Sequence, residues 1–262
     1  MMRTAATTRP FRWLAKAATA FACILAMLPQ AAHADWNWGW GKKVTGSGVS
    51  KTETRQVSGF SGLSLGVSAK VEIRQGSSES VTITGDDNIV PLVETVVEDG
   101  KLKVRWTERN LNTSYKVLKL VVEAKTMESI GVAGSGDVVA ETLSAKTFSA
   151  NVAGSGDIRI NNLIADNVTA KIAGSGDMEF GGKAGSLETK ISGSGDIRAG
   201  KLETKTSSVS IAGSGNVTLW AAEKLRVSVA GSGDVRYYGD PEVSKSVAGS
   251  GNVKRLGKSP NA

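Results

Sequence analysis

The sequence predicts an all-β protein that folds as a parallel β-helix, and three observations lead to this prediction. The motif GSG followed by Asp or Asn occurs seven times, at steps of 20, 20, 19, 20, 18 and 18 residues. The residue two positions before each first glycine and the residue four positions after it are always Val, Ile or Met. Helix signals are nearly absent, since Gly and β-branched residues disfavour helices. A period of this length is typical of a solenoid, whose repeats bury their apolar faces only by stacking on one another.

Each repeat is predicted to form one coil of about 18–20 residues built from three short strands. In residues 149–160 the side chains alternate between polar and apolar, as they do on a strand with one face turned inward. Leu163 and Val168 supply further apolar positions of the same coil. We expect right-handed winding, because left-handed β-helices usually show strict hexapeptide repeats, which this chain lacks.

The GSG motif is interpreted as the corner of the coil rather than as a phosphate-binding loop. A nucleotide loop needs a helix N-terminus directly after it, whereas strands follow here. The glycines would let the chain turn, and the Asp or Asn after them would hold the turn by accepting backbone N–H bonds. The predicted corner glycines are Gly134, Gly136, Gly154, Gly156, Gly174, Gly176, Gly193, Gly195, Gly213, Gly215, Gly231, Gly233, Gly249 and Gly251.

The domain organisation follows from these repeats. Residues 131–255 are the repeat region, and residues 45–130 are less regular opening coils of the same β domain. Within them we expect a hairpin around Asp99 and Gly100, and a short turn or helical bridge over 86–95 capped by an Asp or Asn. A Trp-rich segment, 35–44, precedes this domain, and a tail, 256–262, follows it.

Residues 1–34 have the layout of a secretory signal peptide. Four basic residues precede an apolar run, and the sequence AHA ends at Ala34, where we expect cleavage. No membrane-spanning segment is expected after cleavage, and export places the chain in the periplasm, in the medium or at the cell surface. The leader carries the only Cys and the only His, Cys23 and His33. The mature chain is therefore predicted to lack thiol and imidazole chemistry and disulfides.

The charge of the mature chain argues against nucleic acid as a partner. Removal of the leader leaves 28 basic and 25 acidic side chains, a balance of only +3. No cofactor is expected. Catalysis would rest on carboxylates or on Arg and Lys, and a catalytic cleft would be expected to interrupt the repeat with inserted loops, which are absent between Gly134 and Gly249. We therefore expect a protein that is not an enzyme, with a polysaccharide-active lyase or glycosidase as the alternative.

The acidic residue of the motif lies in one file along the stack. The structural interpretation makes it a turn-holding residue, and the alternative is a row of calcium ligands, because hard cations prefer oxygen donors. Arginines two residues further on point the same way, and they would offset the repulsion within the file. The candidate calcium ligands are Asp137, Asp157, Asp177, Asp196 and Asp234.

Two groups of residues are candidate ligand contacts. Trp36, Trp38 and Trp40 would put three indoles on one face of an extended segment, where they would cover the open end of the β-helix, stack on sugars or enter a membrane interface. The arginines of the outward face are the second group: Arg159, Arg198 and Arg236.

With these features in place, the chain resembles the bacterial family called "putative auto-transporter adhesin, head GIN domain". The resemblance covers about 45–255 and depends on RQVSGFSGLSL, VEIRQG, VTITGDDNIVPLVET, DGKLKV and the repeated GSGD. It implies an exported β-helix without established catalytic residues, for which adhesion has been proposed. We therefore expect a binding, adhesion or structural module of the cell envelope, with a surface glycan or an envelope protein as partner. A polysaccharide-active enzyme and a calcium-stabilised rod are the alternatives.

Overall fold

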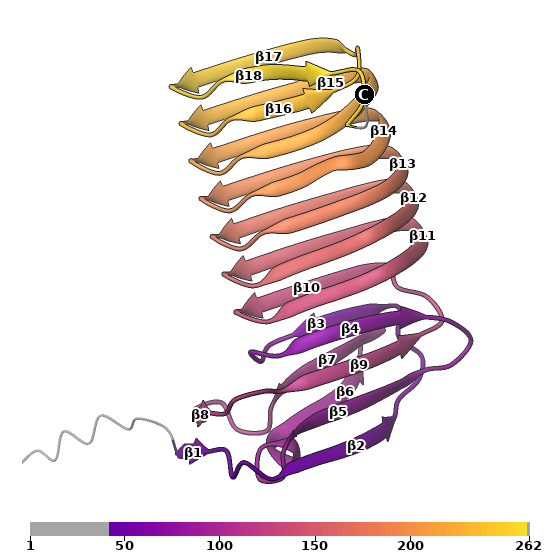
Figure 1. Cartoon of the computed structure of the whole chain (residues 1–262), viewed down its shortest axis with the longest axis vertical. Helices are drawn as coiled ribbons and strands as arrows, with labels where there is room; N and C mark the ends of the chain where they lie inside the picture. Colours follow the sequence, from indigo (N-terminus) through magenta and orange to yellow (C-terminus); the bar gives the residue numbers. More distant parts are fainter. Residues whose placement is uncertain (1–41, 261–262) are drawn as a thin grey trace, which may run out of the picture. The chain divides into compact units, whose positions relative to one another are not determined.

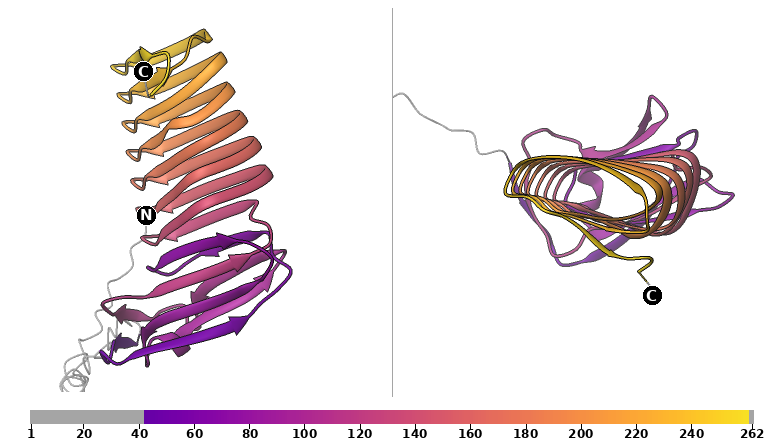
Figure 2. Two further views of the ribbon diagram at one scale, coloured as in Figure 1. Left: turned by 45° about the vertical axis from the view of Figure 1, so that its right-hand side comes forward. Right: turned by 90° about the horizontal axis from the view of Figure 1, so that it is seen from above.

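The computed structural model describes residues 42–260, which form a stack of β-coils (Figure 1). The predicted signal peptide, its cleavage site and Trp36, Trp38 and Trp40 lie outside the described residues. The fold class is the predicted one, an all-β parallel solenoid. Seen from above, each coil is a flattened ring with two long faces (Figure 2).

The opening part builds the two faces of the stack from separate sets of strands. On one face the hydrogen-bonded order is β2, β5, β9, β4, and on the other it is β6, β7, β3, β10. Both sets end on β11, since β4 pairs with its beginning and β10 with its end. The bounds are β1 Lys43–Thr45, β2 Ser50–Gln56, β3 Gly62–Leu65, β4 Lys70–Gln75, β5 Ser80–Asp86, β6 Val93–Glu98, β7 Lys101–Trp106, β8 Asn112–Ser114, β9 Lys119–Ala124 and β10 Ser129–Gly134.

The predicted hairpin is present, because β6 and β7 pair antiparallel around Asp99 and Gly100. Both turn residues have positive φ, 53° and 69°, as a two-residue type I′ turn requires. The predicted helical bridge is a 3₁₀ turn, Val90–Leu92, but its cap prediction was wrong. Ile89 occupies the N-cap position, and no side chain caps the turn, because Ile89 carries no hydrogen-bond acceptor.

From β11 to β15 each coil is a single long strand that bends around the ring, rather than three separated short strands, whereas the coil after β15 is divided into two strands, β16 and β17. β11 runs unbroken for 18 residues, and every coil pairs in parallel with the next at an offset of one repeat. The bounds are β11 Asp137–Gly154, β12 Asp157–Gly174, β13 Met178–Gly193, β14 Ile197–Gly213, β15 Val217–Gly231, β16 Val235–Tyr238, β17 Glu242–Gly249 and β18 Val253–Gly257.

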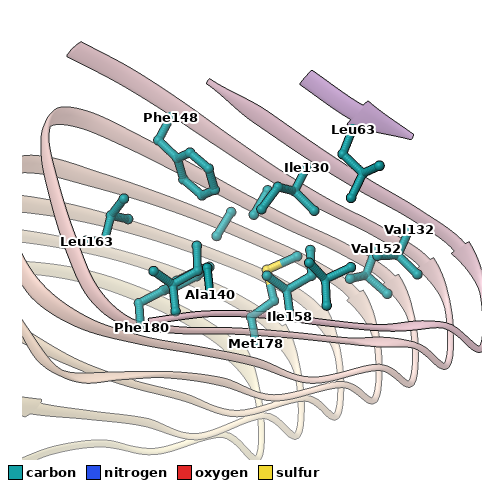
Figure 3. Close-up of a cluster of buried hydrophobic side chains, with 14 of the residues drawn as sticks. Leu63, Ile130, Val132, Ala140, Phe148, Val152, Ile158, Leu163, Met178 and Phe180 are labelled. Carbon is teal, nitrogen blue, oxygen red and sulfur yellow. The ribbon is translucent and has the colours of Figure 1, made fainter. Parts of the chain in front are cut away.

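The core is a set of apolar files, because parallel pairing in register places equivalent side chains over one another. Val132, Val152 and Ile172 lie in one such file and are almost fully buried. The large rings of Phe148 in β11 and Phe180 in β13 fill the interior of two coils that are separated by β12 (Figure 3). Stacking alone buries these side chains, as expected for a repeat that cannot bury them within itself.

The glycines of the corner are required for two different reasons. Gly174 has φ of +133°, a conformation that residues with a side chain rarely adopt. Gly176 has no such φ, but a Cβ there would overlap the carbonyl oxygen of Gly156 and approach Val152 Cγ1 to 2.8 Å. The corner thus needs one glycine for its turn and one for the close approach of the coil before it.

The two strands at the end of the stack, β17 and β18, carry charge at positions that point inward in the coils before them. Lys245 is in register with the buried Val227, and Arg255 is in register with Tyr237. The Arg255 guanidinium donates to the carbonyl of Gly239 at 2.6 Å and lies 3.4 Å from the Asp240 carboxylate. An inward charge on an edge strand disfavours pairing with another chain, so these two strands end the stack.

Candidate functional site

The file of acidic residues forms a hydrogen-bonded ladder along the corners. Asp157 accepts the backbone N–H of Asp177 at 2.9 Å, and Asp177 accepts that of Asp196 at 3.0 Å. The ladder continues through Asn216 to the end of the stack, since Asp196, Asn216 and Asp234 each accept the next backbone N–H at 3.0–3.1 Å. Each side chain therefore holds the corner of the following coil rather than its own.

This arrangement explains why Asn stands in two places of the file. An amide oxygen accepts the same N–H bond as a carboxylate, so the ladder does not require a negative charge at each step. Within residues 42–260, no group of three or more His, Cys, Asp or Glu side chains is placed to share a metal ion.

The predicted arginines lie beside the ladder and pair with carboxylates. The Arg198 guanidinium contacts Asp177 at 2.8 Å and Asp196 at 3.2 Å, so it bridges two coils. The Asp177 carboxylate raises the pKa of Arg198 above its usual value. Arg236 pairs with Asp234 of its own coil at 3.0 Å. The Arg159 guanidinium instead lies 3.1 Å from the carboxylate of Glu179 in the next coil, which is outside the acidic file.

Asp137 is the exception within the file. Within the described part of the chain its carboxylate accepts no hydrogen bond and has no ion-pair partner, in contrast to the four aspartates that follow it. The N–H that it would receive, that of Asp157, is donated instead to the carbonyl of Gly136 at 3.2 Å. Asp137 is also the first member of the file, because the residue in register before it is Lys70. Its carboxylate is therefore available to a ligand.

Two adjoining hollows on the corner side meet at Asp137 and Lys70. The first has a volume of about 300 Å³ and follows the ladder, between Asp137, Asp157, Arg159, Asp177 and Arg198. The second has a volume of about 510 Å³ and extends from the same two residues toward the opening part of the stack. The two hollows share these two residues, and we call them together the corner groove.

The far end of the corner groove contains the aromatic pair Trp106 and Tyr115. Their ring centroids are 5.8 Å apart with an interplanar angle of 62°, an edge-to-face arrangement. The Tyr115 hydroxyl donates to the carbonyl of Ser68 at 2.8 Å, and burial raises the pKa of this hydroxyl. Lys116 also lines this end.

Sequence reasoning missed this part of the groove. Trp106 is the last residue of the hairpin strand β7, and Tyr115 lies in an irregular segment after β8. The only available signal was that two large aromatics flank a short polar stretch, TERNLNTS. These rings line the same hollow as Asp137 because β4 pairs in parallel with β11, and no pattern in the sequence indicates that pairing.

Two other hollows lie on one long face of the coils, the face that continues from β10. One of about 520 Å³ is lined by Glu188, Arg226 and Glu242, among others. Another of about 470 Å³ is lined mainly by apolar and small residues together with Lys171 and Lys190. Neither is lined by an aromatic ring.

The fold and the corner groove define a parallel β-solenoid with a groove along its corners. The chain belongs to the family described as "Putative auto-transporter adhesin, head GIN domain", whose sequence profile matches residues 59–241. This confirms the resemblance drawn from the repeated motifs. No helix within residues 42–260 is both long enough and apolar enough to cross a membrane.

Solved bacterial structures share the fold. A "putative adhesin" from Bacteroides fragilis is 26% identical with a TM-score of 0.76, and the match covers 81% of this chain and all of that one. A "putative lipid binding protein" from Parabacteroides distasonis is 25% identical with a TM-score of 0.70, and the match covers 82% of this chain and all of that one. No curated protein matches the chain.

Proposed function

We propose that the chain is a non-enzymatic, exported binding or adhesion module of the cell envelope that holds a glycan along the corner groove. The observation that carries this proposal is the groove itself, which is lined by charged and apolar side chains, follows the corners of the stack and ends at an aromatic pair. Membership of a family named for adhesion and the signal-peptide layout of residues 1–34 support the same function.

The charges of the groove favour binding over catalysis. Hydrolysis by paired carboxylates needs two such groups that are free to exchange protons or to attack. In the groove Asp157 and Asp177 are engaged by backbone N–H groups, and Glu179 pairs with Arg159 and Lys201. Asp137 has no comparable engagement within the described residues, so the groove offers one free carboxylate rather than a pair.

An extended glycan suits this groove better than a nucleic acid. The carboxylates of Asp137, Asp157 and Asp177 line the groove and would repel a phosphate backbone. Sugar hydroxyls both donate and accept hydrogen bonds, and the groove offers carboxylates together with lysine and arginine groups.

A glycan array combined with a reducing-end assay tests the proposal. We expect the mature chain to bind at least one class of glycan and to release no sugar from it. Absence of binding to every glycan would refute the proposed function, and release of reducing ends at a catalytic rate would establish the polysaccharide-active alternative.

A further inference from the structure

The hollow at Trp106 and Tyr115 combines residues from four separate segments of the chain. Trp106 ends β7, Tyr115 follows β8, Lys70 begins β4 and Asp137 begins β11. It lies where the less regular opening strands give way to the first complete coil, a place that occurs once in the stack. The repeated hollows between coils cannot reproduce it, because the coils after β11 carry no Trp or Tyr at the corner.

The aromatic pair provides an apolar platform of fixed orientation. Both rings are half-buried and pack against the core with part of their surface, while the remainder lines the hollow. The hydrogen bond from the Tyr115 hydroxyl to Ser68 holds that ring in place. Pockets of this kind, aromatic with a few placed polar groups, bind small amphipathic ligands.

Polar groups of both kinds surround the platform. Asp137 supplies a carboxylate with no hydrogen-bond or ion-pair partner among the described residues, and carboxylates make strong charge-assisted hydrogen bonds. Lys70 and Lys116 supply ammonium donors, and within residues 42–260 neither of them lies within 4.0 Å of a carboxylate oxygen. A ligand for this hollow therefore has an apolar face and several hydroxyl groups.

We propose that this hollow is a saccharide subsite, in which one sugar unit packs its C–H face on Trp106. Its hydroxyls donate to the Asp137 carboxylate and accept from Lys70 and Lys116. The proposal rests on the glycan-binding function proposed above and specifies where on the stack that function resides. Because Asp137 lines both hollows, this subsite lies at one end of the corner groove. The rest of the glycan then extends along the ladder.

The test compares matched variants on the same printed glycan array. Trp106→Ala and Asp137→Ala remove the platform and the acceptor. Trp220→Ala and Asp166→Ala are their controls, because Trp220 is half-buried as Trp106 is, Asp166 is a carboxylate of the outer surface, and neither lines the groove. Trp106→Phe keeps a ring at the site and guards against loss of folding, which circular dichroism monitors.

We expect the protein concentration for half-maximal binding to rise about tenfold or more for Trp106→Ala and Asp137→Ala, which corresponds to about 1.4 kcal/mol. Trp106→Phe should retain intermediate binding, and the two controls should bind as the wild type does. A wild type that binds glycans together with unaffected Trp106→Ala and Asp137→Ala variants would overturn the subsite but leave the proposed function intact. A wild type that binds no glycan would overturn both.

Discussion

Substitutions at the corner separate the two reasons for its glycines. Gly134→Ala tests backbone conformation alone, since φ is +102° and an added Cβ would meet nothing within 4 Å. Gly176→Ala tests close approach alone, because its Cβ would overlap the Gly156 carbonyl and crowd Val152. Gly174→Ala combines a φ of +133° with an overlap on Gly154, and the exposed Ser175 between these glycines is the control.

The expected losses of unfolding free energy follow from these contacts. A side chain in this region of positive φ costs about 1–3 kcal/mol, and overpacking against a neighbour costs about 1–3 kcal/mol or more. Gly174→Ala should therefore lose about 2–6 kcal/mol, more than either single effect, whereas Ser175→Ala should stay within about 0.5 kcal/mol of the wild type. Since the backbone cost and the overpacking cost arise at the same residue, their sum is an upper bound on the loss for Gly174→Ala.

Urea unfolding followed by circular dichroism measures these differences. The order from least to most destabilised should be Ser175→Ala, then Gly134→Ala and Gly176→Ala, then Gly174→Ala. The reasoning is refuted if Gly134→Ala is as destabilising as Gly174→Ala, or if Gly176→Ala cannot be told from Ser175→Ala.

Three further predictions concern the end of the stack, acidity and calcium. Lys245→Val should increase concentration-dependent association in analytical ultracentrifugation, because it removes the inward charge of β17; unchanged sedimentation would contradict that role. Lys103 and then Arg105 hold the pKa of Glu98 below 4.5, so the stability from these pairs is present above pH 4.5 and is lost as pH falls through the lower folded-state value. As pH is lowered through that range, the urea midpoint of Glu98→Gln should therefore fall slightly less than that of the wild type. An identical fall in the two proteins would argue against the pairing. Addition of a calcium chelator should leave the melting temperature unchanged, since backbone N–H groups occupy the ladder carboxylates, and a clear drop would favour the calcium-stabilised alternative.

The repeating part of the fold could be predicted from the sequence because its information is local and periodic. Inward positions such as Ile172 and Met178 recur at fixed distances from the glycines, so one coil defines the others. The continuity of the coil strand was not predicted. It results from pairing along almost the whole length of each neighbour, which keeps the backbone extended through the bends.

The contacts of the ladder depend on which residues stack, and the sequence leaves that open. Asp157 was expected to hold its own corner, but the coil spacing brings the N–H of Asp177 within 2.9 Å of its carboxylate. The arginines were expected to offset the acidic file; Arg198 bridges two of its members, whereas Arg159 pairs with Glu179 of the next coil. The aromatic end of the groove is a junction without a repeat, so no periodic signal indicated it.

The central claim is that ligands bind at the corner groove, and hydrogen–deuterium exchange with and without a glycan selected on the array tests it most directly. We predict that the glycan slows exchange at residues 68–70, 106–117 and 135–139, which surround Trp106, Tyr115 and Asp137. Protection confined to the hollow between Ser186 and Ser244 on a long face of the coils would contradict the claim.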